Sequence, residues 1–214
     1  MSSTIRENEA GDDRILLDLL ESVERDGGQS QRRIASELGI ALGLVNAYLK
    51  RCVKKGLVKV SEAPARRYAY YLTPQGFAEK SRLTVEYLTS SFSLFRRARA
   101  DCTEVFSIAH SRGMTRVVVA GISDLSEIAR ICALESGVEI VAVVDPDADV
   151  SVYLGLPVVG TLTEVTTPFD AVVVTKLRLV QETYDAVARE VGADRVLAPK
   201  LLGLRANHRD GALQ

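Results

Sequence analysis

Few side chains in this sequence could carry out catalytic chemistry. The chain of 214 residues has two histidines, His110 and His208, and neither has a nucleophile or a metal-binding pattern near it. Its three cysteines, Cys52, Cys102 and Cys132, are far apart and lie among apolar residues, which is typical of buried thiols rather than of a redox or metal site. We therefore expect no catalytic and no metal-binding residue, and predict that the protein is not an enzyme.

Polar residues that follow predicted strands in the second half of the chain could bind a ligand. Gly121-Ile122-Ser123-Asp124-Leu125-Ser126 stands where a dinucleotide-binding fold would have G-x-G-x-x-G, but serines replace the second and third glycines. Asp124 adds a negative charge beside the place of a pyrophosphate, whereas Asp145 ends the next strand at the right distance to meet a ribose hydroxyl. The nearby Asp147 and Asp149 are more typical of a solvated loop than of a cation site.

Ligands of open α/β sheets bind beyond the carboxyl ends of the strands, which gives a predicted ligand site. Its residues are Gly121, Ile122, Ser123, Asp124, Leu125, Asp145, Pro146, Thr175 and Lys176. Ser123 and the first N–H groups of the following helix could bind an anion that Lys176 neutralises. We expect a small polar ligand, a sugar nucleotide or CoA-like molecule rather than NAD(P). No particular cofactor is indicated, and a domain that only dimerises or docks a protein is the alternative.

Charge divides the chain into two parts. Residues 29–76 contain nine basic and two acidic side chains, whereas residues 117–202 contain six basic and thirteen acidic ones. The first segment suits a polyanion and the second does not.

The basic segment has the order of elements of a winged helix. Helices are predicted over 14–23, from a cap at Ser30, and over 42–55, with glycines at their ends, followed by strands over 57–60 and 68–72. In the third helix Leu42, Val45, Leu49 and Val53 form the expected buried side.

The opposite side of this third helix would enter the major groove of DNA, with Asn46 able to pair with adenine and the basic residues able to contact phosphates. The wing arginines would lie in or along the minor groove. A solvated basic surface is the alternative, but the charge excess coincides with the helix-turn-helix spacing. The predicted DNA-binding residues are Ser30, Gln31, Arg32, Ala41, Leu44, Asn46, Ala47, Lys50, Arg51, Lys54, Arg66 and Arg67.

A long amphipathic helix is predicted to follow over 75–111, with one break near residues 99–101. Its apolar stripe is too large to face water alone, so we expect it to form a homodimer. The predicted dimer residues are Leu88, Phe92, Phe95, Cys102 and Val105.

From residue 114 strands alternate with helices, which predicts parallel βαβ units. Strands are expected over 117–120, 139–144, 157–160, 171–175 and 195–197, with helices over 125–135 and 180–191. The predicted fold class is therefore α/β: a winged helix-turn-helix over 12–74, a helical linker over 75–113, a Rossmann-like three-layer domain over 114–202 with a mainly parallel sheet, and a tail over 203–214.

Several stretches of the first hundred residues resemble MarR-type winged-helix regulators, closest to the subgroup associated with extracellular polysaccharide loci. They are Gln31-Arg-Arg-Ile-Ala-Ser-Glu-Leu-Gly-Ile, Leu44-Val-Asn-Ala-Tyr-Leu-Lys, Lys55-Gly-Leu-Val-Lys and Tyr70-Tyr-Leu-Thr-Pro-Gln-Gly-Phe-Ala-Glu-Lys. The resemblance covers about residues 12–100 and implies a dimer on pseudo-palindromic double-stranded DNA.

A second resemblance concerns the last hundred residues. Val144-Asp145-Pro146-Asp147 and Gly155-Leu156-Pro157-Val158-Val159-Gly160-Thr161-Leu162 resemble the small Rossmann-like domains found before sugar acyltransferases and in CoA-binding proteins. This resemblance covers about residues 115–200.

The sequence as a whole predicts a transcription regulator that binds DNA and responds to a small molecule. No stretch reaches the roughly 18 apolar residues that a membrane span needs, and the polar start resembles no signal peptide, so we expect a cytoplasmic protein. Two rivals stay open: an enzyme or binding protein of nucleotide-sugar metabolism, and a constitutive DNA-binding protein whose α/β domain is architectural.

Overall fold

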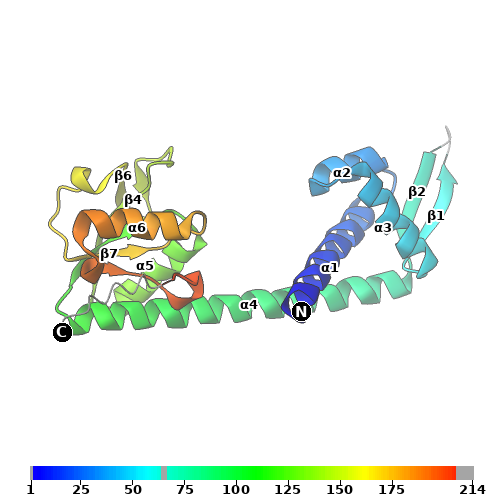
Figure 1. Ribbon diagram of the computed structural model, residues 1–214. Coiled ribbons are helices and arrows are strands. Elements are labelled where there is room, and N and C mark those ends of the chain that lie inside the picture. The colour runs from blue at the N-terminus through cyan, green and yellow to red at the C-terminus, as the bar shows by residue number, and fades with distance from the viewer. Residues whose placement is uncertain (1, 64–66, 206–214) are drawn as a thin grey trace. The chain divides into compact units, whose positions relative to one another are not determined.

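The computed structural model describes residues 2–63 and 67–205, with the side chains of residues 2–10, 63 and 67 left out of the description. The chain divides into two compact units, Met1–Phe92 and Ser93–Gln214, and the boundary falls within one long helix (Figure 1).

The first unit is a three-helix bundle with a two-stranded wing. Its elements are α1 (Ser2–Arg25), α2 (Gln31–Leu38), α3 (Leu42–Lys54), β1 (Val58–Ala63), β2 (Arg67–Leu72) and the first half of α4 (Pro74–Ser111). The helix predicted over 14–23 is longer than expected and begins at Ser2. Its buried leucines pack with Ile34, Val45 and Leu49 into one apolar core.

Local sequence signals set the ends of α2. The Ser30 hydroxyl caps the helix by accepting a hydrogen bond from the Arg33 N–H, and Gly39 ends it in the left-handed conformation with φ of 64°. Gln29 is buried and donates to the carbonyl oxygen of Ser22 at 3.0 Å, which ties the turn before α2 to α1. These contacts define the two ends of α2 and tie its start to α1.

The buried side of α3 differs from the predicted one. Leu42 and Val53, expected in the core, are each 41 % exposed, whereas Tyr48 and Cys52 are buried beside Val45 and Leu49. The hydroxyl of Tyr48 donates to Asp12 of α1 at 2.5 Å, so the polar end of this aromatic ring is satisfied while the ring packs in the core. The helix is therefore rotated relative to the face expected from its aliphatic residues alone.

The wing is an antiparallel pair in which Val58 faces Leu72 and Ser61 faces Ala69. It packs closely on the turn after α1, because the N–H of Tyr70 donates to the carbonyl oxygen of Gly27 at 2.8 Å. A Cβ at Gly27 would lie 2.0 Å from the carbonyl oxygen of Tyr70, so only glycine fits at this approach.

Helix α4 is continuous over Pro74–Ser111, so the predicted break near residues 99–101 is wrong. Thr73 caps it, with its Oγ1 accepting from the Gly76 N–H at 3.0 Å. Cys102 and Val105, expected on an exposed stripe, are buried with Ala98, Phe106 and Ala109 in the core of the second unit. They pack against that unit because α4 covers its sheet, so they cannot contact a partner chain.

The second unit contains a six-stranded sheet of order β5-β6-β4-β3-β7-β8. Every neighbouring pair is parallel except β5 with β6, an antiparallel edge that the sequence analysis missed. The strands are β3 (Arg116–Ala120), β4 (Glu139–Val144), β5 (Val152–Tyr153), β6 (Leu156–Val159), β7 (Ala171–Val174) and β8 (Val196–Leu197).

Helices cover both faces of the sheet (Figure 1). The second half of α4 and α5 (Asp124–Ser136) pack on one face, around Val117, Val119 and Val173. Helix α6 (Val180–Val191) packs on the other, against Val118, Val172 and Val174. Short 3-10 turns occur at η1 (Leu162–Glu164), η2 (Ala193–Arg195) and η3 (Lys200–Leu202).

One crossover of the sheet lacks the helix that usually covers it. The chain passes from β4 to the parallel β6 through a turn and the two-residue strand β5, and within this described segment there is no α-helix. On the α6 side, the ends of β3 and β4 are therefore bordered by α6 and by the segment around η1. Among the described residues, no helix is both long and apolar enough to cross a membrane.

Candidate functional site

The start of α2 offers polar and basic groups on one surface. Arg32 and Arg33 are exposed, and Gln31 is half-buried because its amide donates to the Tyr70 hydroxyl at 2.8 Å. This bond holds the helix start against the wing strand β2. Of the three residues predicted here, Ser30 and Gln31 are therefore engaged within the unit, whereas the Arg32 guanidinium faces solvent.

The exposed face of α3 lies opposite its buried side chains. Gly43, Ala47, Lys50 and Lys54 follow one another at helical spacing along this face, and all four are exposed. Asn46 stands on its flank and is partly buried. The face therefore has small residues in its first half and lysines in its second half.

Arg51 is exposed on α3, as predicted, but it also makes contacts within the unit. Its guanidinium lies 3.4 Å from the Asp12 carboxylate and over the ring of Tyr48, 4.4 Å from the ring centre. The hydrogen bond from Tyr48, with a smaller contribution from Arg51, lowers the pKa of Asp12. The charge of Arg51 is thus partly neutralised within the unit by α1.

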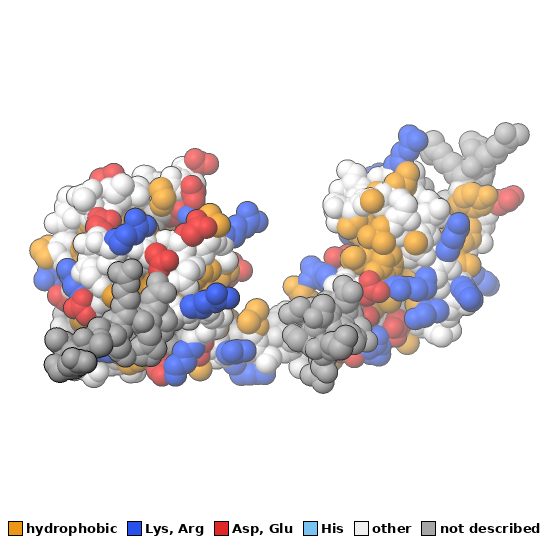
Figure 2. Space-filling view, viewed as in Figure 1, with side chains coloured by type: hydrophobic (Ala, Val, Ile, Leu, Met, Phe, Trp, Pro, Cys, Tyr) orange, Lys and Arg blue, Asp and Glu red, His pale blue; other side chains and the backbone are white. Residues whose placement is uncertain are grey.

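A groove of about 370 Å³ runs between α3 and the wing. Asn46, Lys50 and Lys54 line it from α3, and Val60 and Tyr68 line it from the strands. Figure 2 shows hydrophobic side chains on this unit with lysine and arginine side chains around them. An apolar floor with a basic border suits a ligand that has both apolar edges and negative charge, as the grooves of DNA do.

The two wing arginines were also predicted to bind DNA. Arg66 lies outside the described residues, and Arg67 is described only as the first residue of β2, without its side chain.

In the second unit, the predicted ligand residues come together but largely satisfy one another. Gly121 has φ of 104°, and a Cβ there would lie 2.4 Å from the Lys176 Cβ. The Asp145 carboxylate accepts hydrogen bonds from the backbone N–H of Ile122 at 2.8 Å and from that of Asp147 at 3.1 Å. The Asp145 carboxylate therefore stabilises the turn after β3 and is not a free hydrogen-bond acceptor for a ribose.

Lys176 forms ion pairs with two carboxylates at this end of the sheet. Its Nζ lies 2.6 Å from Asp147 Oδ2 and 3.3 Å from Asp145 Oδ1. Burial raises the pKa of Asp145, but the two backbone N–H groups and Lys176 outweigh it, so the pKa lies below its ordinary value. The bond to Asp147 raises the pKa of Lys176. The charge expected to neutralise a bound anion is therefore already paired with two carboxylates.

The polar groups at the start of α5 also form hydrogen bonds within the unit. The Ser123 hydroxyl donates to the carbonyl oxygen of Thr175 at 2.7 Å, and the Ser123 N–H donates to Ser126 Oγ at 3.0 Å. The Tyr153 hydroxyl from β5 lies 3.2 Å from Glu127 Oε1 in the first turn. With Asp124 in the same turn, this helix start is acidic and covered, so the prediction that Ser123 binds an anion does not fit its geometry.

A pocket of about 230 Å³ opens beside this arrangement on the α6 side of the sheet. Gly121, Pro146 and Lys176 are the predicted ligand residues that line it; Ile122, Ser123, Asp124, Leu125, Asp145 and Thr175 do not. The rest of the lining was not predicted from the sequence. It comes from the ends of β3 and β4, the segment after β6 and one side of α6: Ala120, Val144, Gly160, Thr161, Leu162, Thr183, Ala186, Val187 and Glu190. The small residues Gly160 and Ala186 could have indicated it.

Comparison with known protein families identifies the fold of the first unit. Residues 12–59 match a family described as winged helix-turn-helix DNA-binding. The chain thus contains a winged helix-turn-helix DNA-binding domain. No curated protein matches the chain.

Solved structures that are similar to part of the chain include two of one regulator. Both are of the PcaV transcriptional regulator from Streptomyces coelicolor, one of them in complex with its natural ligand. The first is 21% identical, with a TM-score of 0.31, and the match covers 38% of this chain and 70% of that one. The second is also 21% identical with a TM-score of 0.31, covering 39% and 74%. A similarity this low does not assign a function.

Proposed function

We propose that this protein is a sequence-specific, DNA-binding transcriptional regulator that places α3 in the major groove and its wing along the minor groove. The observation that carries the proposal is the match of residues 12–59 to a DNA-binding winged helix-turn-helix, with Lys50 and Lys54 on the solvent face of α3. A location in the compartment that holds the DNA, the cytoplasm, follows from this function.

The charge distribution along the chain also favours the first unit as the DNA-binding part. Seven more basic than acidic side chains lie within residues 29–76, whereas residues 117–202 have an acidic excess of the same size. A protein that neutralises phosphates releases their counterions, so its affinity falls steeply with salt. The first unit therefore supplies the electrostatic footprint, and the second would be repelled by the DNA backbone.

The salt dependence of binding tests this proposal. Binding of the full chain to fragments of its own promoter is measured by fluorescence anisotropy between 50 and 200 mM salt, a range in which phosphate contacts dominate the change in affinity. Replacing Lys50 and Lys54 by alanine should lower the slope of log K against log salt by about one for each phosphate that the variant no longer neutralises.

The matched control is Arg178→Ala, which removes an exposed charge from the second unit. It should leave the slope unchanged. An equal slope in the parent and in the lysine variant would contradict the placement of α3 on DNA.

We also propose a homodimer formed through the exposed part of the apolar stripe on α4. Leu88, Phe92 and Phe95 are 45 %, 58 % and 43 % exposed. Large side chains in such a row usually mark an interface, and helix-turn-helix dimers bind two half-sites about one helical turn of DNA apart.

A third proposal concerns the second unit, which we infer to be a Rossmann-like domain that senses a small molecule. Its strand order reverses at β3, from which the chain builds first towards β6 and then towards β8. Ligands of such sheets bind at this reversal, beyond the carboxyl ends of the strands. The pocket beside Gly121 lies at this reversal. At the start of α5, by contrast, the polar groups are already hydrogen-bonded within the unit.

The pocket favours part of a larger polar molecule. Its walls are largely apolar, with Thr161, Thr183 and Glu190 also in the lining, whereas the Lys176 charge is paired with Asp145 and Asp147. Its volume of about 230 Å³ is below the about 300–1,000 Å³ of most ligand sites, so it would hold the sugar or ring of a sugar nucleotide or CoA-like molecule.

A pocket-filling substitution tests this third proposal. Nucleotide sugars, acyl-CoAs and dinucleotides are screened by thermal shift and calorimetry against the parent and against Ala186→Leu, which adds bulk to one wall of the pocket. Ala100→Leu, at an exposed position of α4 in the same unit, is the control. Binding that is lost only in Ala186→Leu supports the pocket. No binding to the parent, or undiminished binding in Ala186→Leu, favours a purely architectural domain.

A further inference from the structure

The two halves of α3 present different chemistry to the solvent. Lys50 and Lys54 lie in the second half, whereas the segment Leu42-Gly43-Leu44-Val45-Asn46-Ala47-Tyr48-Leu49 contains no charged residue. Within it Leu42 is 41 % exposed and Leu44 is 39 % exposed, although both are large and apolar. The first half is thus an apolar and amide surface, and the second half is a cationic one.

The first half of a recognition helix is the part that meets base edges. Only one base presents an apolar group in the major groove, because thymine carries a C5-methyl group there, whereas guanine offers two acceptors and cytosine an amine donor. Leucine side chains can neither donate to guanine nor accept from cytosine. Leu42 and Leu44 therefore match thymine, and the Asn46 amide matches the N6 and N7 groups of adenine.

Small residues allow this half to approach the bases closely. Gly43 and Ala47 occupy the middle of the exposed face, and a Cβ added at Gly43 would have nothing within 4 Å. The helix backbone itself can therefore enter the groove deeply, which brings the two leucines on its flanks to the depth of the base edges. The lysines of the second half then reach the phosphates.

We propose that α3 reads A·T base pairs, by contact of Leu42 and Leu44 with thymine methyl groups and of Asn46 with adenine. The segment from Leu42 to Leu49 makes no contact that selects guanine. The inference rests on the proposed DNA-binding function and specifies the base pairs that this helix selects.

The test uses a duplex from which only methyl groups are removed. The full chain selects its operator from a library of random duplexes, and each thymine of that operator is then replaced singly by deoxyuridine. Dissociation constants are measured at one fixed salt concentration. Each contacted thymine should show binding about fourfold weaker after replacement, the ratio that corresponds to about 0.8 kcal/mol for one buried methyl group.

Protein variants assign the contacts. Leu42→Ala and Leu44→Ala should each abolish the difference between thymine and deoxyuridine at their own positions, with unchanged thermal unfolding because both side chains are exposed. Lys50→Ala is the control: it should weaken binding to every duplex and leave the thymine-to-deoxyuridine ratio as in the parent.

The outcomes separate this inference from the function on which it rests. An operator whose half-sites are bound specifically, but equally well with thymine and deoxyuridine or with G·C pairs beneath α3, overturns the inference and leaves the DNA-binding function intact. Failure of the library to yield any preferred duplex overturns the function itself. Methyl dependence that persists in both leucine variants also overturns the assignment to α3.

Discussion

At the scale of single residues, the second unit depends on a few groups at the carboxyl end of its sheet. Gly121 lets β3 turn against Lys176, and the buried Asp145 carboxylate binds the backbone N–H of Ile122 in the same turn. These residues looked like ligand groups in the sequence, because a glycine and an aspartate at strand ends serve that purpose in dinucleotide folds. In this protein their polar atoms are engaged in holding the turn.

Gly121→Ala should destabilise the second unit through two effects. Alanine at φ of 104° is strained, and its Cβ would lie 2.7 Å from the backbone N of Lys176. The control Gly137→Ala has φ of 74° but nothing within 4 Å of the new Cβ, so it carries only the strain of about 1–2 kcal/mol. Urea unfolding followed by circular dichroism should show Gly121→Ala less stable than the control by about 2 kcal/mol. Equal losses would mean that the close approach to Lys176 relaxes freely.

The second unit should also lose stability in acid because of Asp145. Its pKa in the folded protein is below the ordinary value of 3.8, so its contribution is present above that pH and is lost as the pH falls through the folded pKa. Asp145→Asn should therefore lower stability at pH 7 and reduce the further loss between neutral pH and pH 2, in urea unfolding at a series of pH values.

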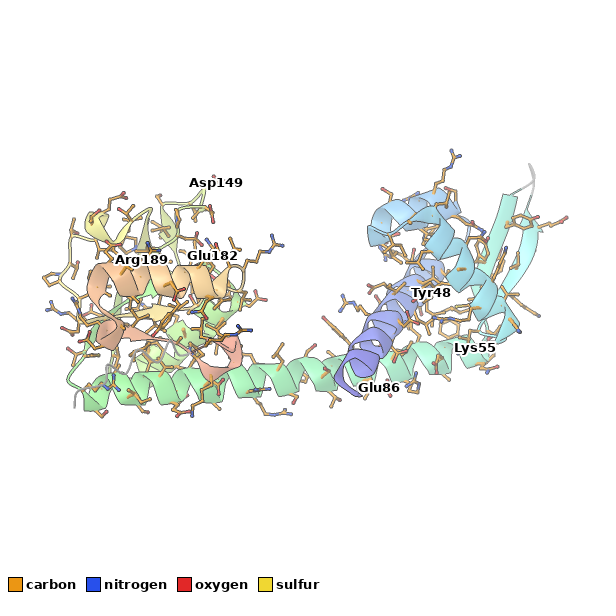
Figure 3. The ribbon with its side chains drawn as sticks, viewed as in Figure 1. Tyr48, Lys55, Glu86, Asp149, Glu182 and Arg189 are labelled. Atoms are coloured by element: carbon orange, nitrogen blue, oxygen red, sulfur yellow. The ribbon has the colours of Figure 1, made fainter. Side chains whose placement is uncertain are left out.

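Some acid sensitivity will remain in that variant, because the backbone N–H of Arg116, and less strongly that of Thr115, lowers the pKa of Asp170 in the same unit. Asp149→Asn is the control, since this side chain is exposed on the same loop (Figure 3). Identical pH profiles for the parent and Asp145→Asn would show that the carboxylate does not stabilise the turn.

At the scale of elements, α4 is one helix with two environments. Its last part is buried against the sheet through Ala98, Cys102 and Phe106, and burial raises the pKa of the Cys102 thiol to about 12. Its middle part is exposed and carries Leu88 and Phe92. The continuous stripe seen in the sequence is thus part core and part available surface.

Two charges on the available part should break the proposed dimer. Phe92→Asp together with Phe95→Asp should yield monomers in light-scattering measurements and lose operator affinity, because aspartates cannot be buried unpaired in an apolar interface. Ser93→Asp, which adds one charge to an exposed position between them, is the control for charge alone. A dimer that survives the double substitution would contradict the assignment of this surface.

At the scale of the whole molecule, each hydrophobic core lies within one of the two units. One cluster belongs to the winged helix, and the clusters on the two faces of the sheet belong to the second unit. Separate cores normally unfold as separate cooperative transitions.

Calorimetry should accordingly show two unfolding transitions in the full chain. Gly121→Ala should lower the midpoint of one transition, and Leu83→Ala, which truncates a side chain in the winged-helix core, should lower the midpoint of the other. The unchanged transition in each variant serves as the internal control. A single transition that both variants shift together would show that α4 couples the two units into one cooperative system.

The sequence by itself determined the order of the main elements, although it did not indicate the two-residue strand β5. Helical periodicity, glycine stops and the cap at Ser30 predicted α2 and α3, and alternation of strands with helices predicted the mainly parallel sheet. These signals are local, because backbone conformation and burial of one face follow from neighbours within a few turns. The match of residues 12–59 to a DNA-binding winged helix confirms the interpretation of the first segment at that level.

Only the tertiary structure decided which side chains are free to act. Arg51 looks like an unpaired basic residue in the sequence, whereas in the fold its guanidinium lies 3.4 Å from Asp12, thirty-nine positions away. Cys102 and Val105 look like interface residues until the sheet covers them, and Leu42 looks like core until Tyr48 turns α3 towards α1. In each instance the deciding contact joins segments distant in the chain, and sequence periodicity states that a face is apolar without stating what lies against it.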